Sequence, residues 1–424
     1  MDKIIKDRID AIRQGLSANE YTKTEIGVCP CNWQVKKLSD IAEKVTQTAG
    51  TNSYETVSIS AGIGFVNQAK KFGKELSGKQ YEKYTVLHKG DFSYNKGNSN
   101  KYPQGCIYRL KDRETAAVPN VFESFRIQDG CAEFYDHLFI SGFLNQQLSK
   151  KINRGVRDDG LLNLTEKDFY SCLLPFPPLV EQKRISEILD HFDKLINLCE
   201  AKVNEYKSLK KTCLCKMFPQ NGSNVPELRF PGFTGAWEQR KLGELGEILT
   251  GSTPATSNTE YYSEDGIPWV TPTDINSQTI SDTPKKLSEK GAKVGRVVPE
   301  NTILCTCIAS IGKNTLLTVK GSFNQQINSL TPYNENDAYF LLTESEIWSE
   351  KMKRMAASGT MEIVNKTEFS ELTTKVPKSV EQEKIGLYFR HIDNLITLHQ
   401  READEYTRLK KAMTQLLLTG IVRV

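Results

Sequence analysis

Two long segments of the chain place apolar residues every three or four positions, which is the spacing of one face of an α-helix. The first segment, residues 180–217, contains no proline or glycine, and its apolar positions are Ile185, Ile188, Phe192, Leu195, Cys199, Tyr206, Leu209 and Cys213. In the second segment the positions are Ile385, Tyr388, Ile392, Leu395, Tyr406, Leu409, Met413 and Leu416. The pattern predicts two long helices, each with a heptad seam that can pair with another helix.

Both predicted helices follow a proline-containing stretch, PFPPLV or KVPKSV, where helices commonly begin. Glu181 and Glu381 fall in the first turns, where a negative charge interacts favourably with the helix dipole. Both seams are interrupted at one matching place, by Lys202 and Glu402, and His399 faces the second seam. A helix of roughly 36 residues would be about 54 Å long.

The two helical segments are copies of one another. Residues 175–220 align with residues 375–420 at an offset of 200 without a gap, and 15 of the 46 positions are identical. Unrelated sequences of average composition would match at about three positions. The stretch EYKSLKK at 205–211 thus returns as EYTRLKK at 405–411, and upstream WQVKKL at 33–38 returns as WEQRKL at 237–242. The chain therefore runs through a marker, a variable block and a helix, and then through the same order again.

Two helices of equal length with one apolar stripe each can bury those stripes against one another. The alignment without gaps favours an antiparallel pair related by a two-fold axis, which would place the variable blocks at opposite ends; a parallel pair would place both at one end. We therefore predict an α+β fold: two mixed α/β blocks separated by two long, antiparallel, paired helices in a pseudo-two-fold internal repeat. The residues expected to pair the helices are Ile185, Phe192, Leu195, Tyr206, Leu209, Ile385, Ile392, Leu395, Tyr406 and Leu409.

The variable blocks contain strand patterns such as EKYTVL and NTILCTCIASI between turns rich in Gly, Asn and Ser. The expected organisation is a helical N-terminal segment at 1–20, block one at 21–174, helix one at 175–220, a linker at 221–236, block two at 237–374 and helix two at 375–424.

Composition narrows the class of protein. The chain is 38% hydrophobic and 25% charged, without a run of about 18 apolar residues, so we expect no membrane span. The N-terminal stretch MDKIIKDRIDAIRQGL is charged throughout and does not resemble a secretory signal. The ten cysteines are scattered, which favours reduced thiols in a cytoplasmic protein. The net charge of +4 is in itself weak evidence for nucleic-acid binding.

The known catalytic and metal motifs are missing from the sequence. PFPPL lacks the amide or acid before Pro-Pro and the aromatic after it that an adenine methyltransferase needs, and SAGIGF holds a lone Gly-x-Gly typical of a turn. ASIGKNT lacks the first Gly and the Ser/Thr of a P-loop, and an acid-x-lysine reading of Glu181 and Lys183 fails because the second copy has Glu383. The three CxC pairs have no partner pair at zinc spacing. We expect no catalytic residue, no metal and no cofactor bound by this chain.

Two polar stretches are candidates for binding. In block one, GDFSYNKGNSNKYPQG at 90–105 interleaves lysines, aromatics and amides, which suits base edges and phosphates. In block two, TGSTPATSNTEYYSEDGIPWVTPTDI at 250–275 is polar and aromatic. Each could equally be a surface loop, the second one packed by Trp269.

With these motifs in hand, the layout resembles the specificity subunit of type I restriction-modification systems. VPELRFPGFTGAWEQRKLGEL is similar to the lead-in to a target-recognition domain of that family, and the stretch at 250–275 resembles its TGGTP…IPW…DI opening, with Ser252 where a second Gly is common. GSFNQQINSL resembles the FNQ segment, and both long helices resemble the P…EQ..I…D..I helix. The likeness covers the chain after about residue 25, although block one departs from the GGTP pattern.

The resemblance implies a function. Each block would be a target-recognition domain that reads one half of a bipartite double-stranded DNA target, and the paired helices would set the spacer and dock two methyltransferase subunits. Restriction and translocase subunits would join the complex. The chain would be a non-catalytic, cytoplasmic subunit of an adenine-specific methyltransferase and type I endonuclease, whose partners use S-adenosylmethionine, ATP and Mg²⁺.

Matching positions in the halves suggest three DNA-contacting loops in each, including the stretch Thr51–Tyr54. The residues expected to contact DNA are Tyr94, Lys96, Asn98, Lys101, Tyr102, Arg154, Arg157, Thr253, Ser257, Asn258, Tyr261, Tyr262, Ser310, Lys313, Ser358 and Thr360. Two alternatives stay open. A coiled-coil adaptor with two protein-binding heads would not bind DNA at all, and a fused enzyme would turn over substrate by itself, against which the missing motifs argue.

Overall fold

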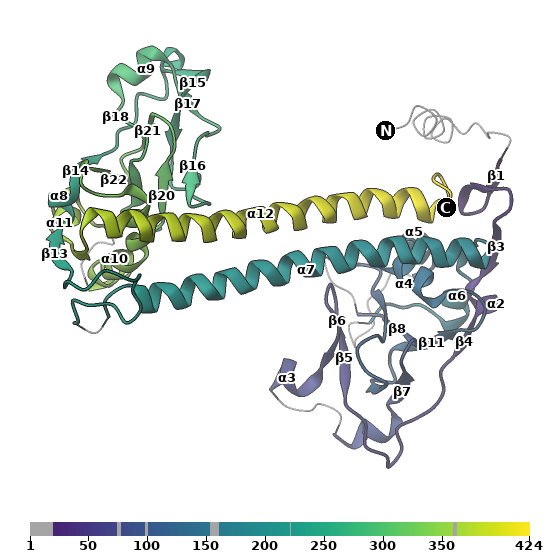
Figure 1. Cartoon of the computed structure of the whole chain (residues 1–424). Helices are drawn as coiled ribbons and strands as arrows, with labels where there is room; N and C mark the ends of the chain where they lie inside the picture. Colours follow the sequence, from purple (N-terminus) through teal and green to yellow (C-terminus); the bar gives the residue numbers. More distant parts are fainter. Residues whose placement is uncertain (1–19, 74–77, 98–100, 153–160, 221, 359–362) are drawn as a thin grey trace. The chain divides into compact units, whose positions relative to one another are not determined.

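The computed structural model describes residues 20–73, 78–97, 101–152, 161–220, 222–358 and 363–424 (Figure 1). The helical segment expected at 1–20 lies outside these ranges except for its last residue. The chain forms two compact units. Unit 1 comprises Met1–Asn197 together with Ala403–Val424, and unit 2 comprises Leu198–Glu402. Each long helix therefore contributes one part to each unit.

Unit 1 is built from short antiparallel strands and helices. Its central sheet has the strand order β4-β11-β8-β9, and the pairs β1-β2, β3-β12, β5-β6 and β7-β10 surround it. The strands are β1 (Tyr21–Thr24), β2 (Gly27–Pro30), β3 (Gln34–Lys37), β4 (Ala42–Lys44), β5 (Val57–Ser60), β6 (Gly64–Asn67), β7 (Thr85–His88), β8 (Phe92–Asn95), β9 (Cys106–Arg109), β10 (Thr115–Val118), β11 (Glu123–Ile127) and β12 (Leu173–Phe176). The helices are α2 (Leu38–Ile41), α3 (Gln68–Phe72), the 3-10 helix η1 (Gly78–Lys83), α4 (Ala132–Ile140), α5 (Asn145–Lys151) and α6 (Glu166–Tyr170).

An aromatic core lies between the central sheet, α4 and the long helices. Phe92 stacks on Phe125 with ring centroids 5.3 Å apart, and Phe139 of α4 meets both rings edge to face. Leu417 and Leu418, from the end of the second long helix, are buried in the same cluster. The C-terminal segment of the chain is therefore part of the core of unit 1.

Unit 2 contains one sheet of five strands and one of four. Their strand orders are β14-β22-β19-β20-β16 and β17-β15-β21-β18, and β13 pairs with β23. The strands are β13 (Glu238–Lys241), β14 (Gly246–Thr250), β15 (Tyr262–Val270), β16 (Thr279–Ile280), β17 (Lys286–Leu287), β18 (Val297–Val298), β19 (Ile303–Thr306), β20 (Asn314–Leu317), β21 (Gly321–Phe323), β22 (Ile327–Pro332) and β23 (Thr373–Val376). The helices are α8 (Leu242–Leu245), η2 (Thr259–Tyr261), α9 (Glu289–Val294), α10 (Ala338–Ser358) and α11 (Lys366–Glu371).

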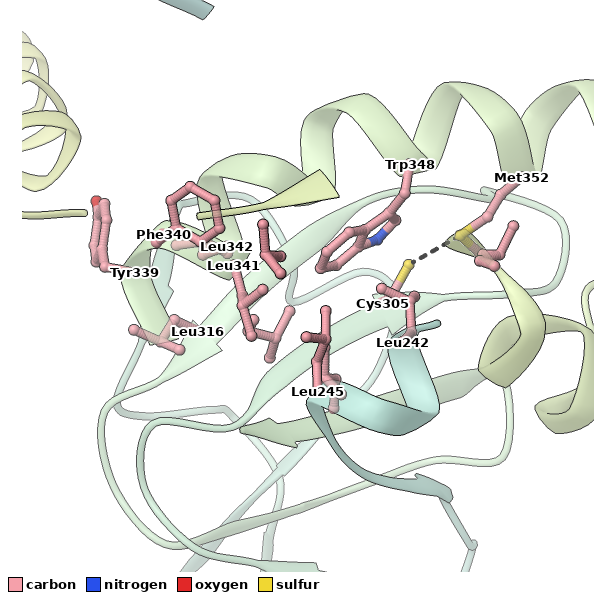
Figure 2. Packing of buried hydrophobic residues seen from close by; sticks show 14 of the residues in the cluster. Leu242, Leu245, Cys305, Leu316, Tyr339, Phe340, Leu341, Leu342, Trp348 and Met352 are labelled. Atoms are coloured by element: carbon pink, nitrogen blue, oxygen red, sulfur yellow. Dashed lines mark hydrogen bonds between the residues drawn. The ribbon is translucent and has the colours of Figure 1, made fainter. Parts of the chain in front are cut away.

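The main core of unit 2 lies where α10 covers the larger sheet. Figure 2 shows Trp348 and Met352 of α10 directed toward Cys305, with Leu242 and Leu245 of α8 below them. The Sγ atom of Cys305 lies 3.6 Å from Sδ of Met352. These side chains are buried, so α10 is fixed on the sheet by apolar packing.

The sequence markers begin both units in the same way. Each forms a strand that pairs with the strand just before a long helix, β3 with β12 and β13 with β23. Each strand then enters a short helix whose first turn is capped by an acid: Asp40 accepts a bond from the backbone N–H of Lys37, and Glu244 accepts one from that of Lys241. The echo of WQVKKL in WEQRKL is therefore a repeated strand-and-cap unit.

The prediction of two long helices is confirmed. Helix α7 spans Leu179–Met217 and α12 spans Ser379–Leu418. Helix α12 contains one glycine near its start, Gly386, which lies against the beginning of α10. A Cβ atom at this position would come within 2.1 Å of Oδ1 of Asp337, so a larger residue would not fit without a shift.

In unit 1, Asp193 pairs with Lys410 and the earlier Glu181 pairs with the later Arg423. In unit 2, Lys210 pairs with Asp393 and the earlier Cys199 contacts the later Glu402. In each unit the part of α7 and the part of α12 therefore run antiparallel (Figure 1).

The buried seam is partly offset from the predicted one. Ile185, Cys199 and Cys213 are buried as expected. At three other places the buried residue lies one position after the expected one: Leu189 follows Ile188, Val203 follows Lys202, and Lys210 follows Leu209. Leu209 and Leu409 are 41% and 40% exposed, so their assignment to the seam is corrected. Lys202 and Glu402 lie beside the seam and do not interrupt it. Spacings of three and four fit the sequence equally well, and only the partner helix selects between them.

Of the other residues expected to pair the helices, Ile185, Ile385 and Ile392 are buried, and the remaining ones are half-buried. The half-buried residues are Phe192, Leu195, Tyr206, Leu395 and Tyr406. Ile185 and Ile385 belong to the cores of units 1 and 2, respectively, so they pack against the globular blocks as well.

Candidate nucleic-acid interface

The glutamate of the repeated EQ motif binds an arginine in each unit. In unit 1, Arg423 donates two hydrogen bonds to Glu181, at 2.5 and 2.8 Å. In unit 2, Arg229 donates two to Glu381, at 2.6 and 2.7 Å. Each arginine comes from the segment that follows the other long helix. The paired charges are largely buried, so each glutamate fixes the end of one helix to the start of the other.

The glutamine of the motif connects each long helix to its globular block. Gln182 donates to the carbonyl of Pro177 at 2.8 Å and accepts from the N–H of Cys131 at 2.8 Å, where α4 begins. Gln382 donates to the carbonyl of Pro377 at 3.0 Å and accepts from the N–H of Asp337 at 3.0 Å, just before α10. Both residues of the motif thus hold the blocks on the helices.

The repeated lysine at the end of EYxxLKK forms an ion pair across the helices. Lys410 lies 2.5 Å from Asp193 in unit 1, and Lys210 lies 2.9 Å from Asp393 in unit 2. Glu346 of α10 adds a second carboxylate 2.7 Å from Lys210. Burial lowers the pKa of Lys210, but the two carboxylates outweigh burial and raise it above its usual value. The lysine therefore stays charged inside the seam.

In unit 1 the expected contact residues fall into different environments. Tyr94 is buried, its ring stacks on Phe169 at 4.8 Å, and its hydroxyl donates to the carbonyl of Gln104, which gives it a packing role. Lys96 is half-buried, with its Nζ atom 3.5 Å from Glu123. Lys101 is exposed, 5.9 Å from the ring centroid of Tyr102. Asn98, Arg154 and Arg157 lie outside the described residues.

Beside Tyr102 lies the tip of the β5–β6 hairpin. Gly62 and Gly64 have φ angles of 84° and 106°, which only glycine adopts readily, and Ile63 between them is 75% exposed. The hydroxyl of Tyr108 accepts a bond from the N–H of Gly62 at 2.8 Å, and burial raises the pKa of Tyr108 to about 12. SAGIGF is thus a turn, as expected, but it presents an exposed apolar side chain. An isoleucine between two glycines is a signal that the sequence analysis did not use.

In unit 2 several expected contact residues hold their own loop. The hydroxyl of Tyr262 donates to the carbonyl of Pro254 at 2.8 Å, and its ring lies 6.2 Å from that of Trp269. Asn258 caps η2 by accepting from the N–H of Glu260 at 3.1 Å. Thr253 is exposed and donates to Gln325. Ser257 is exposed and Tyr261 half-buried.

The loop between β19 and β20 carries Ser310 and Lys313, both exposed. Ala309 has a φ angle of 62° and Gly312 one of 81°, so the loop turns tightly. The N–H of Lys313 donates to the hydroxyl of Thr306 at 3.0 Å. Thr360 lies outside the described residues, as does the side chain of Ser358. The backbone of this loop is therefore well fixed, while the charge of Lys313 projects from it.

Lys313 also lines a polar hollow of about 760 Å³ in unit 2. Lys207 of α7 and Arg401 of α12 line it as well, opposite Asn276 and Gln278 of the segment between β15 and β16. Three exposed cations and several amides therefore line the hollow, and the carboxylates of Glu346 and Asp393, which also line it, are paired with Lys210. The sequence analysis missed the residues other than Lys313, because two lie on helices that were read only for their seams.

The described residues provide no helix that is long and apolar enough to cross a membrane. Two surfaces are the interface candidates: the hairpin tip with Lys101 and Tyr102 in unit 1, and the polar hollow with Lys313 in unit 2.

Comparisons with known proteins agree with this architecture. A Methanocaldococcus jannaschii protein named as the MjaX specificity subunit of a type I restriction enzyme is 24% identical over 95% of this chain and 97% of its own length. The HindI specificity subunit of Haemophilus influenzae is 26% identical over 54% of this chain and 51% of its own length. The crystal structure of a type I restriction-modification S subunit from M. genitalium has the same fold, with a TM-score of 0.62, 15% identity, and 91% and 96% of the two chains covered. Residues 30–207 and 235–408 each match the type I restriction modification DNA specificity domain, and the chain belongs to that family.

Proposed function

We propose that this chain is the sequence-reading subunit of a type I restriction-modification complex, and that each unit reads one half of a bipartite double-stranded DNA target. The observation that carries the proposal is the duplicated junction. Glu181 with Arg423 and Glu381 with Arg229 form the same junction in two units whose sheets differ in strand order. Recognition of a split target requires this combination of a repeated frame and two unlike readers. The target-recognition domains are assigned to residues 21–174 and 237–374.

In unit 2 we assign DNA contact to the polar hollow. Lys207, Lys313 and Arg401 would bind phosphates, which attract cations irrespective of sequence. Asn276 and Gln278 carry amides of the type that read base edges in the major groove. The exposed Thr253 and Ser257 extend the same proposal to the loop before η2.

In unit 1 we assign DNA contact to the hairpin tip, with Ile63, Lys101 and Tyr102 as its contact residues. Apolar side chains that protrude from a rigid turn are used by other proteins to wedge between base steps, and a nearby lysine supplies phosphate contact. Arg154 and Arg157 remain candidates on the basis of the sequence.

The chemistry is assigned to partner subunits. We infer that two methyltransferase subunits dock on the long helices, which carry apolar side chains that are exposed at equivalent positions in both copies. These are Val180 and Val380, Leu198 and Leu398, and Leu209 and Leu409. S-adenosylmethionine, ATP and Mg²⁺ would serve the methyltransferase and the restriction subunits, and adenine is the proposed methylated base.

The test is a map of modified adenines. The chain is expressed with the methyltransferase subunit from the same source in a host that lacks adenine methylation, and the genome is sequenced by a single-molecule method. We expect a two-part motif with a fixed unspecified spacer, absent when the chain is omitted. No modification by an intact complex would overturn the proposal in favour of the protein-binding adaptor.

Lys313→Ala tests the interface of unit 2, with Lys366→Ala as the matched control because Lys366 is an exposed lysine on α11, outside the hollow. If Lys313 binds phosphate, DNA affinity falls for every sequence and its salt dependence decreases by about one ion. If Lys313 reads a base, one position of one half-site becomes degenerate. An unchanged motif, affinity and salt dependence would remove Lys313 from the interface.

A further inference from the structure

Three side chains with metal-binding chemistry meet at the edge of the helix seam of unit 2. Cys199 comes from α7, and His399 and Glu402 come from successive turns of α12. Their ligand atoms all lie within 4.8 Å of one another. The Nδ1 atom of His399 is 2.9 Å from Oε2 of Glu402, and Sγ of Cys199 is 3.8 Å from the same oxygen.

These separations are close to those of a first coordination shell. Around a tetrahedral zinc ion, with Zn–S near 2.3 Å and Zn–N and Zn–O near 2.1 Å, sulfur and oxygen lie about 3.6 Å apart and nitrogen and oxygen about 3.4 Å apart. For the sulfur–oxygen and nitrogen–oxygen pairs, the change needed is about 0.2 and about 0.5 Å. A histidine and a glutamate three residues apart on one helix is also the spacing used by helical-bundle metal sites.

The surroundings favour a bound cation. The Cys199 side chain is buried, whereas those of His399 and Glu402 are 22% and 41% exposed, which leaves a route for an ion and a water ligand. Tyr206 stacks on the His399 ring with centroids 5.8 Å apart and fixes its orientation. Lys202, one turn from Cys199, is bound to Glu205 at 2.8 Å.

A second cluster of potential metal ligands differs from this one because it already has a compensating cation. In unit 1, His137, Asp190 and Asp193 also lie within 4.8 Å of one another. There the Nζ atom of Lys410 is 2.5 Å from Asp193 and already supplies the compensating cation. The cluster of Cys199, His399 and Glu402 offers a thiol in place of a second carboxylate. A thiolate ligand favours zinc, whereas Mg²⁺ and Ca²⁺ favour oxygen ligands.

We propose that Cys199, His399 and Glu402 bind a zinc-type divalent cation that links α7 to α12 within unit 2. The site goes beyond the proposed function and does not depend on DNA binding. Without the metal, the Cys199 thiol donates to Glu402. Binding therefore displaces one proton from Cys199 and leaves the thiolate on the metal.

The experiment titrates the full-length chain with Co²⁺, whose bond to a thiolate gives a charge-transfer absorption in the near ultraviolet. We expect one Co²⁺ per chain, displaced by Zn²⁺, and a higher thermal unfolding midpoint with Zn²⁺ than with chelator. Cys199→Ser should abolish the absorption. His399→Gln and Glu402→Gln should weaken binding at least about tenfold.

Cys215→Ser and His391→Gln are the matched controls, because they remove an exposed cysteine of α7 and an exposed histidine of α12 and should leave the titration unchanged. Absorption that persists in Cys199→Ser, or is absent from the folded wild-type chain, would overturn the site. If Cys199→Ser does not fold, Glu402→Gln decides, since its side chain is partly exposed and an unweakened titration would also refute the proposal. None of these outcomes bears on the adenine map.

Discussion

At the scale of single residues, a buried ionisable group can make the free energy of unfolding depend on pH. Glu344 of α10 is buried, and one carboxylate oxygen accepts a bond from Thr374, whereas the other has no hydrogen-bond partner among the described residues. Burial raises the pKa of Glu344 to about 8. The exposed Glu350, one and a half turns further along α10, has its pKa lowered by Lys353.

Glu344 should make stability depend on pH. The unfolded chain releases this proton near pH 4.5 and the folded chain near pH 8, so the free energy of unfolding falls as pH rises between these values. The loss is at most about 5 kcal/mol. Glu344→Gln should remove this slope from denaturant midpoints, while Glu350→Gln should preserve it. A slope that survives Glu344→Gln would assign the pH dependence to other groups.

At the scale of elements, the junctions and the seam hold each helix in place. The ion pair of Arg229 and Glu381 is the junction of unit 2, and the carboxylate of Glu381 is almost fully buried. Removing one partner of a buried pair leaves an uncompensated charge, which costs far more than loss of a surface ion pair.

Arg229→Met should therefore destabilise unit 2 by about 3 kcal/mol, measured by denaturant unfolding. Arg240→Met is the control, because the Arg240 side chain is 43% exposed and its loss should cost less than about 1 kcal/mol. Adding Glu381→Gln to Arg229→Met should recover part of the loss. A double variant less stable than Arg229→Met would contradict this account.

The corrected seam also makes a prediction. Val203→Gln places an amide in the buried seam and should cost about 1–3 kcal/mol, whereas Leu209→Gln lies at an exposed position and should change stability by less than about 0.5 kcal/mol. Unfolding of the two variants compares the two phases of the heptad directly. The reverse order of stability would restore the phase predicted from sequence.

At the scale of the whole molecule, each long helix contributes one part to each unit, so an insertion between these parts tests the proposed spacing role of the helices. Inserting one heptad after Asn197 and one after Glu402 keeps the phase of both seams and lengthens each helix by about 10.5 Å. Under the proposed function, the unspecified spacer should grow by about three base pairs while both half-sites stay the same. An unchanged spacer in the adenine map would show that the helices do not set it.

The sequence by itself determined the duplicated order of marker, block and helix, because a gap-free repeat and a 3-4 apolar spacing are local patterns. It also located EQ and EYxxLKK as repeated features, although not their bonding partners. Arg423 and Arg229 could not be assigned to Glu181 and Glu381, since these residues are distant in the chain and only folding brings them together.

Only the tertiary structure decided which side chains of each pattern are enclosed. Tyr94 was expected in a DNA-contacting loop, but its ring is buried against Phe169. The repeat identified Lys210, and only the structure shows that it is buried beside Asp393. The polar hollow and the cluster of Cys199, His399 and Glu402 were also found only in the structure, because their residues come from different elements of unit 2. Periodicity specifies the direction in which a side chain points along its own helix, whereas burial, pairing and binding depend on what another element places against it.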